Sequence, residues 1–174
     1  MKAKYYRSWH LARNDGEYNI TEFEWTMIRF YEAFTRCVTT VGALTVDVDI
    51  KYSELVILHV VGMQDRPKNS ATIARMINRD DIPNIQYSLR KLESANLVKK
   101  TREKSGKTFA YSLTEIGERA TEEYAAIRAE LLLSNLGTIA NFDDMITKMT
   151  QLLGVMTGIY EETARSSATF SHLE

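Results

Sequence analysis

The chain has 174 residues with a net charge of −1 at pH 7, and 44% of its residues are hydrophobic and 26% charged. These values are ordinary for a soluble protein with one main domain and a hydrophobic core. The single cysteine, Cys37, excludes an internal disulfide and a cysteine zinc site, and it fits a reducing cytoplasm. The sequence shows neither a secretory signal nor an apolar run of membrane-spanning length, so we expect a cytoplasmic protein without a membrane partner.

The first predicted helix follows an N-terminal arm. Residues 1–20 are polar and aromatic without a clear period, and we interpret them as this arm. Thr21 and Glu24 have the spacing of a capping box, which opens a helix. Apolar and aromatic residues then recur at helical spacing, which predicts a helix from Thr21 to about Leu44 with a long aromatic-rich stripe. A linker over residues 45–52 follows.

Three shorter helices are predicted next. The first, ELVILHVVGM, is apolar nearly all round and therefore buried, with Ser53 as its N-cap. Ser70 is expected to cap the second helix, ATIARMIN. The third helix has Asp81 as its N-cap and runs over residues 82–95, with Asn96 as a left-handed C-cap.

The helix over residues 82–95 has two distinct faces. Ile85, Leu89 and Leu92 recur at helical spacing, so we expect them to be buried. The opposite face carries side chains that can contact DNA, namely Asn84, Gln86, Tyr87, Arg90 and Lys91.

A β-hairpin is predicted after this helix, with strands over residues 97–103 and 108–114 and a turn at KSGK. The letters GKT in this turn also end the phosphate-binding loop of nucleotide hydrolases. Thr101 stands where that loop needs its first glycine, and a strand rather than a helix follows, so we reject a nucleotide-binding loop. The cations of the hairpin are Lys99, Lys100, Arg102, Lys104 and Lys107.

Basic residues are concentrated in this part of the chain. Between Asn84 and Thr108 there are seven basic and two acidic residues, a net charge of +5 against −6 for the remainder. A locally basic segment is typical of a nucleic-acid-binding surface, although a solvated basic face without a partner is the alternative. The order of short helix, turn, polar-faced helix and basic hairpin is that of a winged helix-turn-helix. In such a domain the polar-faced helix reads base edges in the major groove, and hairpin cations meet phosphates or the minor groove.

The sequence resembles the MarR family of winged-helix transcriptional regulators. The resemblance is carried by IARMINRDDIPNIQYSLRKLESANLVKK and by SGKTFAYSLTEIG, that is, L-R-K-L-E-x-x-x-L-V, a hairpin, and then L-T-E-x-G. It covers Ser53 to Gly117, and the flanking helices match only in kind. A narrower similarity, to the LdtR-like branch of the family, is an open alternative.

This resemblance implies a homodimer that binds a pseudo-palindromic site on double-stranded DNA and represses or activates nearby genes. It also implies release by a small, often aromatic or phenolic, effector. By position, the recognition helix is residues 82–95 and the wing is residues 99–109. Many family members carry an Asp-x-Arg pair in the wing, but the leading aspartate is missing around Arg102, so Arg102 and Lys104 are both candidates for the minor-groove contact.

The predicted fold class is mainly α with a small β-hairpin wing. Residues 53–117 form the winged helix-turn-helix domain, and residues 21–52 and 118–174 supply long dimerisation helices. The last part contains two predicted helices, EIGERATEEYAAIRAELLLSNL and FDDMITKMTQLLGVMTGIYEETARS. A domain of 65 residues has little surface with which to cover the apolar stripes on both sides, so a second copy of the chain is expected to cover them.

An effector pocket is expected where the first helices meet the winged domain. Aromatic residues at helical spacing are also common core residues, which is the alternative interpretation. The candidates to line the pocket are Trp25, Arg29, Phe30, Tyr52 and His59.

The sequence gives little support for metal binding, redox sensing or catalysis. His10, His59 and His172 stand singly, so we expect no metal and no other cofactor. Cys37 is either an oxidant-sensing thiol near Tyr31 or a small buried hydrophobic residue. No nucleophile and base have a telling spacing, so we do not expect an enzyme. The predicted function is a dimeric DNA-binding transcriptional regulator; the alternative is a winged-helix module that binds a protein partner.

Overall fold

The computed structural model describes residues 9–102 and 108–170. It divides into two compact units, Met1–Ile127 and Arg128–Glu174, each of which is described by itself. The first unit contains α1 (Asp15–Gly42), α2 (Tyr52–Gly62), a single 3-10 turn η2 (Met63–Asp65), α3 (Ser70–Met76), α4 (Ile82–Ser94), β1 (Val98–Arg102), β2 (Phe109–Leu113) and α5 (Glu115–Arg128). The predicted fold class, mainly helical with a small hairpin, is confirmed.

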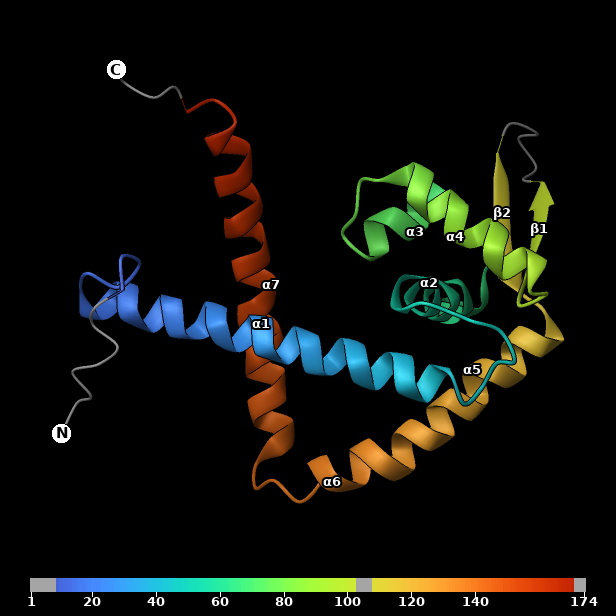
Figure 1. Ribbon diagram of the computed structural model, residues 1–174, viewed down its shortest axis with the longest axis horizontal. Coiled ribbons are helices and arrows are strands. Elements are labelled where there is room, and N and C mark those ends of the chain that lie inside the picture. The colour runs from blue at the N-terminus through green and yellow to red at the C-terminus, as the bar shows by residue number, and fades with distance from the viewer. Residues whose placement is uncertain (1–8, 103–107, 171–174) are drawn as a thin grey trace. The chain divides into compact units, whose positions relative to one another are not determined.

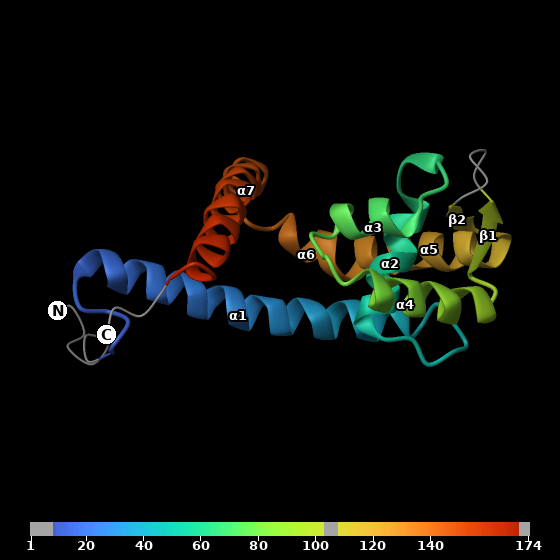
Figure 2. The same cartoon turned by 90° about the horizontal axis from the view of Figure 1, so that it is seen from above.

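The core of the first unit is built around α2. Because α2 is apolar on nearly every side, it can pack against α1, α3, α4 and β2 at once, and it does so. Figure 1 shows α2, α3 and α4 gathered beside the hairpin, while the N-terminal half of α1 extends beyond them, as it also does in Figure 2. The predicted buried stripe of α4 is confirmed, since Ile85 and Leu89 are fully buried and Leu92 is nearly so.

The start of α1 differs from the prediction. The helix begins at Asp15, where the Asn14 side chain accepts the backbone N–H of Glu17 at 3.0 Å. Thr21 lies within α1 instead of at its start. Its hydroxyl donates to the carbonyls of Leu11 (2.7 Å), which precedes the helix, and Glu17 (2.9 Å). The predicted capping box is therefore wrong, and residues 15–20 belong to the helix rather than to an arm.

Two further caps are displaced from their predicted positions. Helix α2 begins after Lys51, whose backbone N–H donates to the Glu54 carboxylate at 2.7 Å, so Ser53 is not its N-cap. Helix α3 is capped by Asn69, which accepts the N–H of Thr72 at 2.9 Å, rather than by its neighbour Ser70.

Helix α4 has the predicted boundaries within one residue. Asp81 occupies the N-cap position, but its carboxylate makes no backbone cap bond. At the other end Asn96 has a φ of 56°, which confirms the predicted left-handed C-cap.

The hairpin is a two-stranded antiparallel sheet in which Lys99 pairs with Ser112 and Arg102 with Phe109. Successive side chains of a strand point to opposite faces, so Lys99 lies on one face of β1 and Lys100 and Arg102 lie on the other. The middle of β2 is joined to the loop before α3, where the backbones of Lys68 and Tyr111 form a bridge with two hydrogen bonds of 2.9 Å.

The second unit contains a π-helical turn (Ala129–Leu133), the short helix α6 (Ser134–Leu136) and the long helix α7 (Phe142–Ser167). The sequence predicted one continuous helix over residues 115–136, and the π-helical turn interrupts it. None of the described residues from 128 to 170 is buried. Large apolar side chains are exposed along α7 at Met145, Met149, Leu152, Val155, Ile159 and Tyr160.

Candidate nucleic-acid interface

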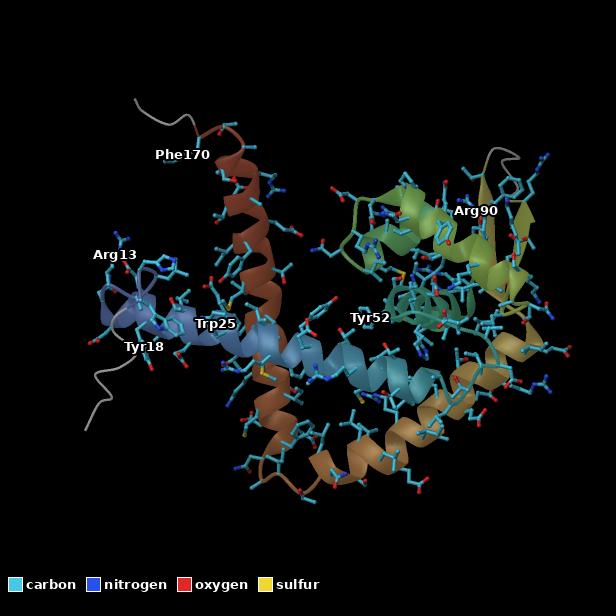
Figure 3. All side chains as sticks on the ribbon, in the orientation of Figure 1. Arg13, Tyr18, Trp25, Tyr52, Arg90 and Phe170 are labelled. Carbon is cyan, nitrogen blue, oxygen red and sulfur yellow. The ribbon has the colours of Figure 1, made fainter. Side chains whose placement is uncertain are left out.

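The outer face of α4 presents polar side chains to solvent. Asn84, Gln86, Tyr87 and Arg90 are all exposed, and Tyr87 keeps 60% of its surface accessible. Asn84, Tyr87 and Arg90 follow one another at intervals of three residues, and Gln86 lies four residues before Arg90, so the four side chains share one broad face of the helix. Figure 3 shows Arg90 beside the hairpin, on the part of α4 nearest to the strands.

A hydrogen-bond network fixes the first turn of this face. The Asp81 carboxylate accepts from the Arg79 guanidinium, with one N–O distance of 2.8 Å, and from the Asn84 amide at 3.0 Å. The bond from Arg79, and then that from Asn84, hold the pKa of Asp81 below its usual value of 3.8. Asn84 therefore has a defined orientation, with its amide oxygen free of this contact.

Lys91 has a different environment from the other predicted contacts. Its ammonium donates to the Glu54 carboxylate at 3.0 Å and to the Asp49 carbonyl at 3.1 Å. The Glu54 side chain is only 3% exposed, and its hydrogen bond with Lys91 raises the pKa of that lysine. Lys91 therefore joins α4 to α2, and its ammonium is already bonded to Glu54 and Asp49.

Removal of the Lys91 ammonium is expected to destabilise the fold. In a Lys91→Ala variant the buried Glu54 carboxylate loses its cationic partner, so the free energy of unfolding should fall by clearly more than when an exposed ion pair is broken. Urea denaturation measures this loss. Lys148→Ala is a matched control, because it breaks a lysine–carboxylate pair whose side chains are 72% and 64% exposed. Such a pair contributes about 0.5 kcal/mol or less. Equal losses in the two variants would contradict a structural role for Lys91.

The hairpin divides its cations between two faces. Lys100 and Arg102 lie over the ring of Phe109, at 4.0 Å and 5.6 Å from its centroid. The aromatic ring attracts both cations and limits their conformations. Lys99 points to the opposite face, where it borders a cavity, so it is separated from Lys100 and Arg102. Lys104, Lys107 and the tip glycine Gly106 lie outside the described residues.

Sequence reasoning missed Phe109. The hairpin register alone could have identified it, because Phe109 lies directly opposite Arg102. One face of the hairpin thus carries two cations and one exposed aromatic ring. This arrangement suits a nucleic-acid backbone, since phosphates attract the cations while the ring holds their side chains extended.

The five predicted effector residues are distributed over α1 and α2. Trp25 makes an edge contact with Trp9, with ring centroids 5.9 Å apart, on the extended half of α1 (Figure 3). Phe30 and Arg29 are exposed on the same helix, where Phe30 stacks on Phe34.

Tyr52 and His59 lie elsewhere. Tyr52 packs edge-on against Tyr31 and Phe34, and burial raises its pKa. His59 borders a cavity of about 590 Å³, and its ring also packs on Tyr124 with centroids 4.3 Å apart. The role of these five residues in one effector pocket stays a prediction.

Three further expectations concern Cys37, metal ligands and membrane-spanning helices. Cys37 is exposed, so the interpretation as a small buried residue is wrong, and its role as a sensor stays a prediction. Within residues 9–102 and 108–170, no three potential metal ligands come together. No described helix combines the length and the apolar character needed to cross a membrane.

Comparison with known proteins identifies the domain. A sequence model of the winged helix DNA-binding domain family matches residues 50–117. No curated protein matches the sequence. Among solved structures, the MarR family transcription regulator SP03579 is similar, with a TM-score of 0.66, 12% identity, and coverage of 87% of this chain and 99% of that one.

Two further structures support the same fold. The transcriptional regulator BldR from Sulfolobus solfataricus has a TM-score of 0.64 at 17% identity, with 78% of this chain and 95% of that chain covered. MepR from S. aureus, in a DNA complex, has a TM-score of 0.63 at 15% identity, covering 77% and 96%. Residues 50–117 therefore match the winged helix DNA-binding domain family, and the chain has the fold of solved MarR family transcription regulators.

Proposed function

We propose that this protein is a member of the MarR family that acts as a homodimer and regulates transcription by sequence-specific binding to a pseudo-palindromic site on double-stranded DNA. The observation that carries the proposal is the exposed set of Asn84, Gln86, Tyr87 and Arg90 on α4, next to Lys100 and Arg102 on the wing. MepR, which shares the fold, is known in a DNA complex.

The chemistry of these side chains suits separate parts of a duplex. An α-helix fits the major groove, where Asn84 and Gln86 can pair with adenine and Arg90 with both acceptors of guanine. Lys100 and Arg102 are suited to contacts with phosphates or the minor groove. Such contacts position the protein on the duplex without reading every base. Arg102 is our choice for the minor-groove contact, because Phe109 supports its side chain where this wing lacks an aspartate.

The uncovered apolar surface supports the proposal of a dimer. The second unit buries none of its described residues, and α1 exposes Trp25, Ile28, Phe30 and Tyr31. Surfaces of this kind are normally covered by a partner, and a two-fold axis places two recognition helices about one DNA turn apart, ~34 Å. Sedimentation velocity at micromolar concentration should give a dimer, and a monomer alone would contradict this part of the proposal.

The DNA-binding proposal is tested by fluorescence anisotropy with the duplex upstream of the gene and a scrambled duplex of equal composition. We expect selective binding that persists near physiological salt, with a log–log salt slope of about −0.9 for each neutralised phosphate. Equal and weak binding to both duplexes that vanishes with salt would contradict sequence reading. That result would favour the alternative, a winged-helix module for a protein partner.

Release by a small aromatic effector is the last part of this proposal. Tyr52, Tyr31 and Phe34 form an aromatic contact between α1 and α2, so a ligand inserted there would change how α1 meets the DNA-binding domain. Small phenols and aromatic acids should then lower DNA affinity in the same anisotropy assay. Unchanged affinity in the presence of all of them would contradict effector release.

A further inference from the structure

The winged domain contains a cavity that is separate from the proposed DNA-binding surface. It has a volume of about 590 Å³ and lies between the C-terminal end of α2, the loop that follows it, the Lys99 face of the hairpin, and α5. Every residue that lines it belongs to the first unit. Its size is within the usual range for sites that bind small molecules, ~300–1,000 Å³.

One wall of the cavity is held in place by a buried lysine. The Lys68 ammonium donates to the carbonyls of Val61 (3.1 Å), Arg66 (3.0 Å) and Met63. All three acceptor residues line the cavity, and Lys68 itself is 2% exposed. Burial of an ammonium is costly unless its donors are satisfied, so these three bonds hold the loop in one conformation. The backbone bridge from Lys68 to Tyr111 joins the same wall to the wing. The cavity is therefore preformed, which lowers the entropic cost of filling it.

The cavity carries charges of both signs that do not neutralise each other. Arg66 and Lys99 line it, as do Glu118 and Glu122, which lie one helical turn apart on α5. Among the ion pairs of the described residues, none joins either cation to either carboxylate. The Arg66 guanidinium bonds instead to the Gln64 side-chain oxygen at 2.8 Å. Two cations and two carboxylates thus line the same cavity, and all four can pair with a ligand.

The rest of the lining is partly apolar. Val61, Met63 and Leu113 contribute hydrocarbon surface between the charged groups. A ligand with one charge would leave the groups of the other sign facing its apolar part, which is unfavourable. A ligand with an ammonium, a carboxylate and an apolar body would satisfy both pairs and cover the hydrocarbon surface.

We propose that this cavity binds a small zwitterion with an apolar body, of the size of an amino acid or a dipeptide. Its ammonium pairs with Glu118 and Glu122, and its carboxylate pairs with Arg66 and Lys99. Because α2, the wing and α5 all line the cavity, a bound ligand contacts all three elements and stabilises the position of the wing against the two helices. The site does not depend on DNA binding, and its test contains no DNA.

Isothermal titration with the dipeptide Leu-Phe tests the proposal, together with two blocked forms. N-acetyl-Leu-Phe lacks the ammonium, and Leu-Phe amide lacks the carboxylate. We expect saturable binding of Leu-Phe at micromolar to millimolar concentration and at least ~tenfold weaker binding of each blocked form. In amide NMR spectra, Leu-Phe should shift the signals of Ser112 and Thr121, which line the cavity.

A double substitution tests whether Glu118 and Glu122 bind the ammonium of the ligand. The double variant Glu118→Gln and Glu122→Gln should bind Leu-Phe about tenfold more weakly, while its affinity for N-acetyl-Leu-Phe stays the same. The matched control is Glu115→Gln with Glu123→Gln, which removes the same charge from exposed positions of α5 outside the cavity. No saturable binding of Leu-Phe, equal binding of the blocked forms, or equal weakening by the control would each overturn the proposal.

Discussion

Substitution of Gly117 by alanine is expected to lower the free energy of unfolding by at least ~3 kcal/mol. A Cβ atom at this position would lie 2.0 Å from the Leu97 carbonyl oxygen, which is a backbone atom and cannot rotate away. That carbonyl accepts the N–H of Thr114 at 3.1 Å, and the Thr114 hydroxyl caps α5 by accepting the N–H of Gly117 at 3.0 Å. The added methyl group must therefore separate α5 from the base of the wing.

Gly154→Ala is the matched control for this prediction. An added Cβ at Gly154 meets no atom within 4 Å, so the change should be neutral or should stabilise α7 by up to about 1 kcal/mol. Thermal unfolding at one fixed protein concentration compares the two variants with wild type. Wild-type stability of Gly117→Ala would mean that α5 does not pack against the residue before β1.

Substitution of Arg90 by alanine is expected to have the largest effect on DNA binding. A bidentate contact to guanine is worth about 1–3 kcal/mol, so affinity for the preferred site should fall roughly 5- to 150-fold, while affinity for scrambled DNA changes less. Anisotropy titrations at one salt concentration measure both affinities. Arg90→Lys keeps the charge but not the two parallel donors, so it should recover part of the affinity and little of the selectivity.

Arg119→Ala is the control for charge alone. Arg119 is exposed on α5 and is not among the proposed DNA contacts, so its removal should leave selectivity unchanged. If Arg90→Ala binds the preferred site as tightly as wild type, the reading face of α4 is placed wrongly.

The sequence predicted the order of the elements and the core of the winged domain, because apolar periodicity is set by the geometry of a helix. The buried stripe of Ile85, Leu89 and Leu92 and the left-handed Asn96 follow from local rules alone. Local rules did less well where several cap residues compete. Asn69 and Ser70 are adjacent and both can cap a helix, so only the packing of α3 decides between them.

The candidate site was harder to predict where its residues make long-range contacts. Lys91 has the same helical spacing as the exposed residues of α4, but its partner Glu54 lies 37 residues earlier in the chain. The cavity bordered by His59 is formed by segments distant in sequence, and no pattern in one segment indicates it. The predicted effector residues also lie on separate segments, since Trp25 and Phe30 belong to α1 and His59 belongs to α2.

The alternation of side chains along β1 constrains how this wing can change in length. Lys100 and Arg102 lie on the face of Phe109, and Lys99 lies on the cavity face, because neighbouring residues of a strand point in opposite directions. Insertion or deletion of one residue before Lys99 would exchange the two sets, so that the cations proposed to contact DNA would face the cavity. Insertion of two residues would restore the original faces. We therefore expect homologous wings that keep both surfaces to differ in this strand by even numbers of residues.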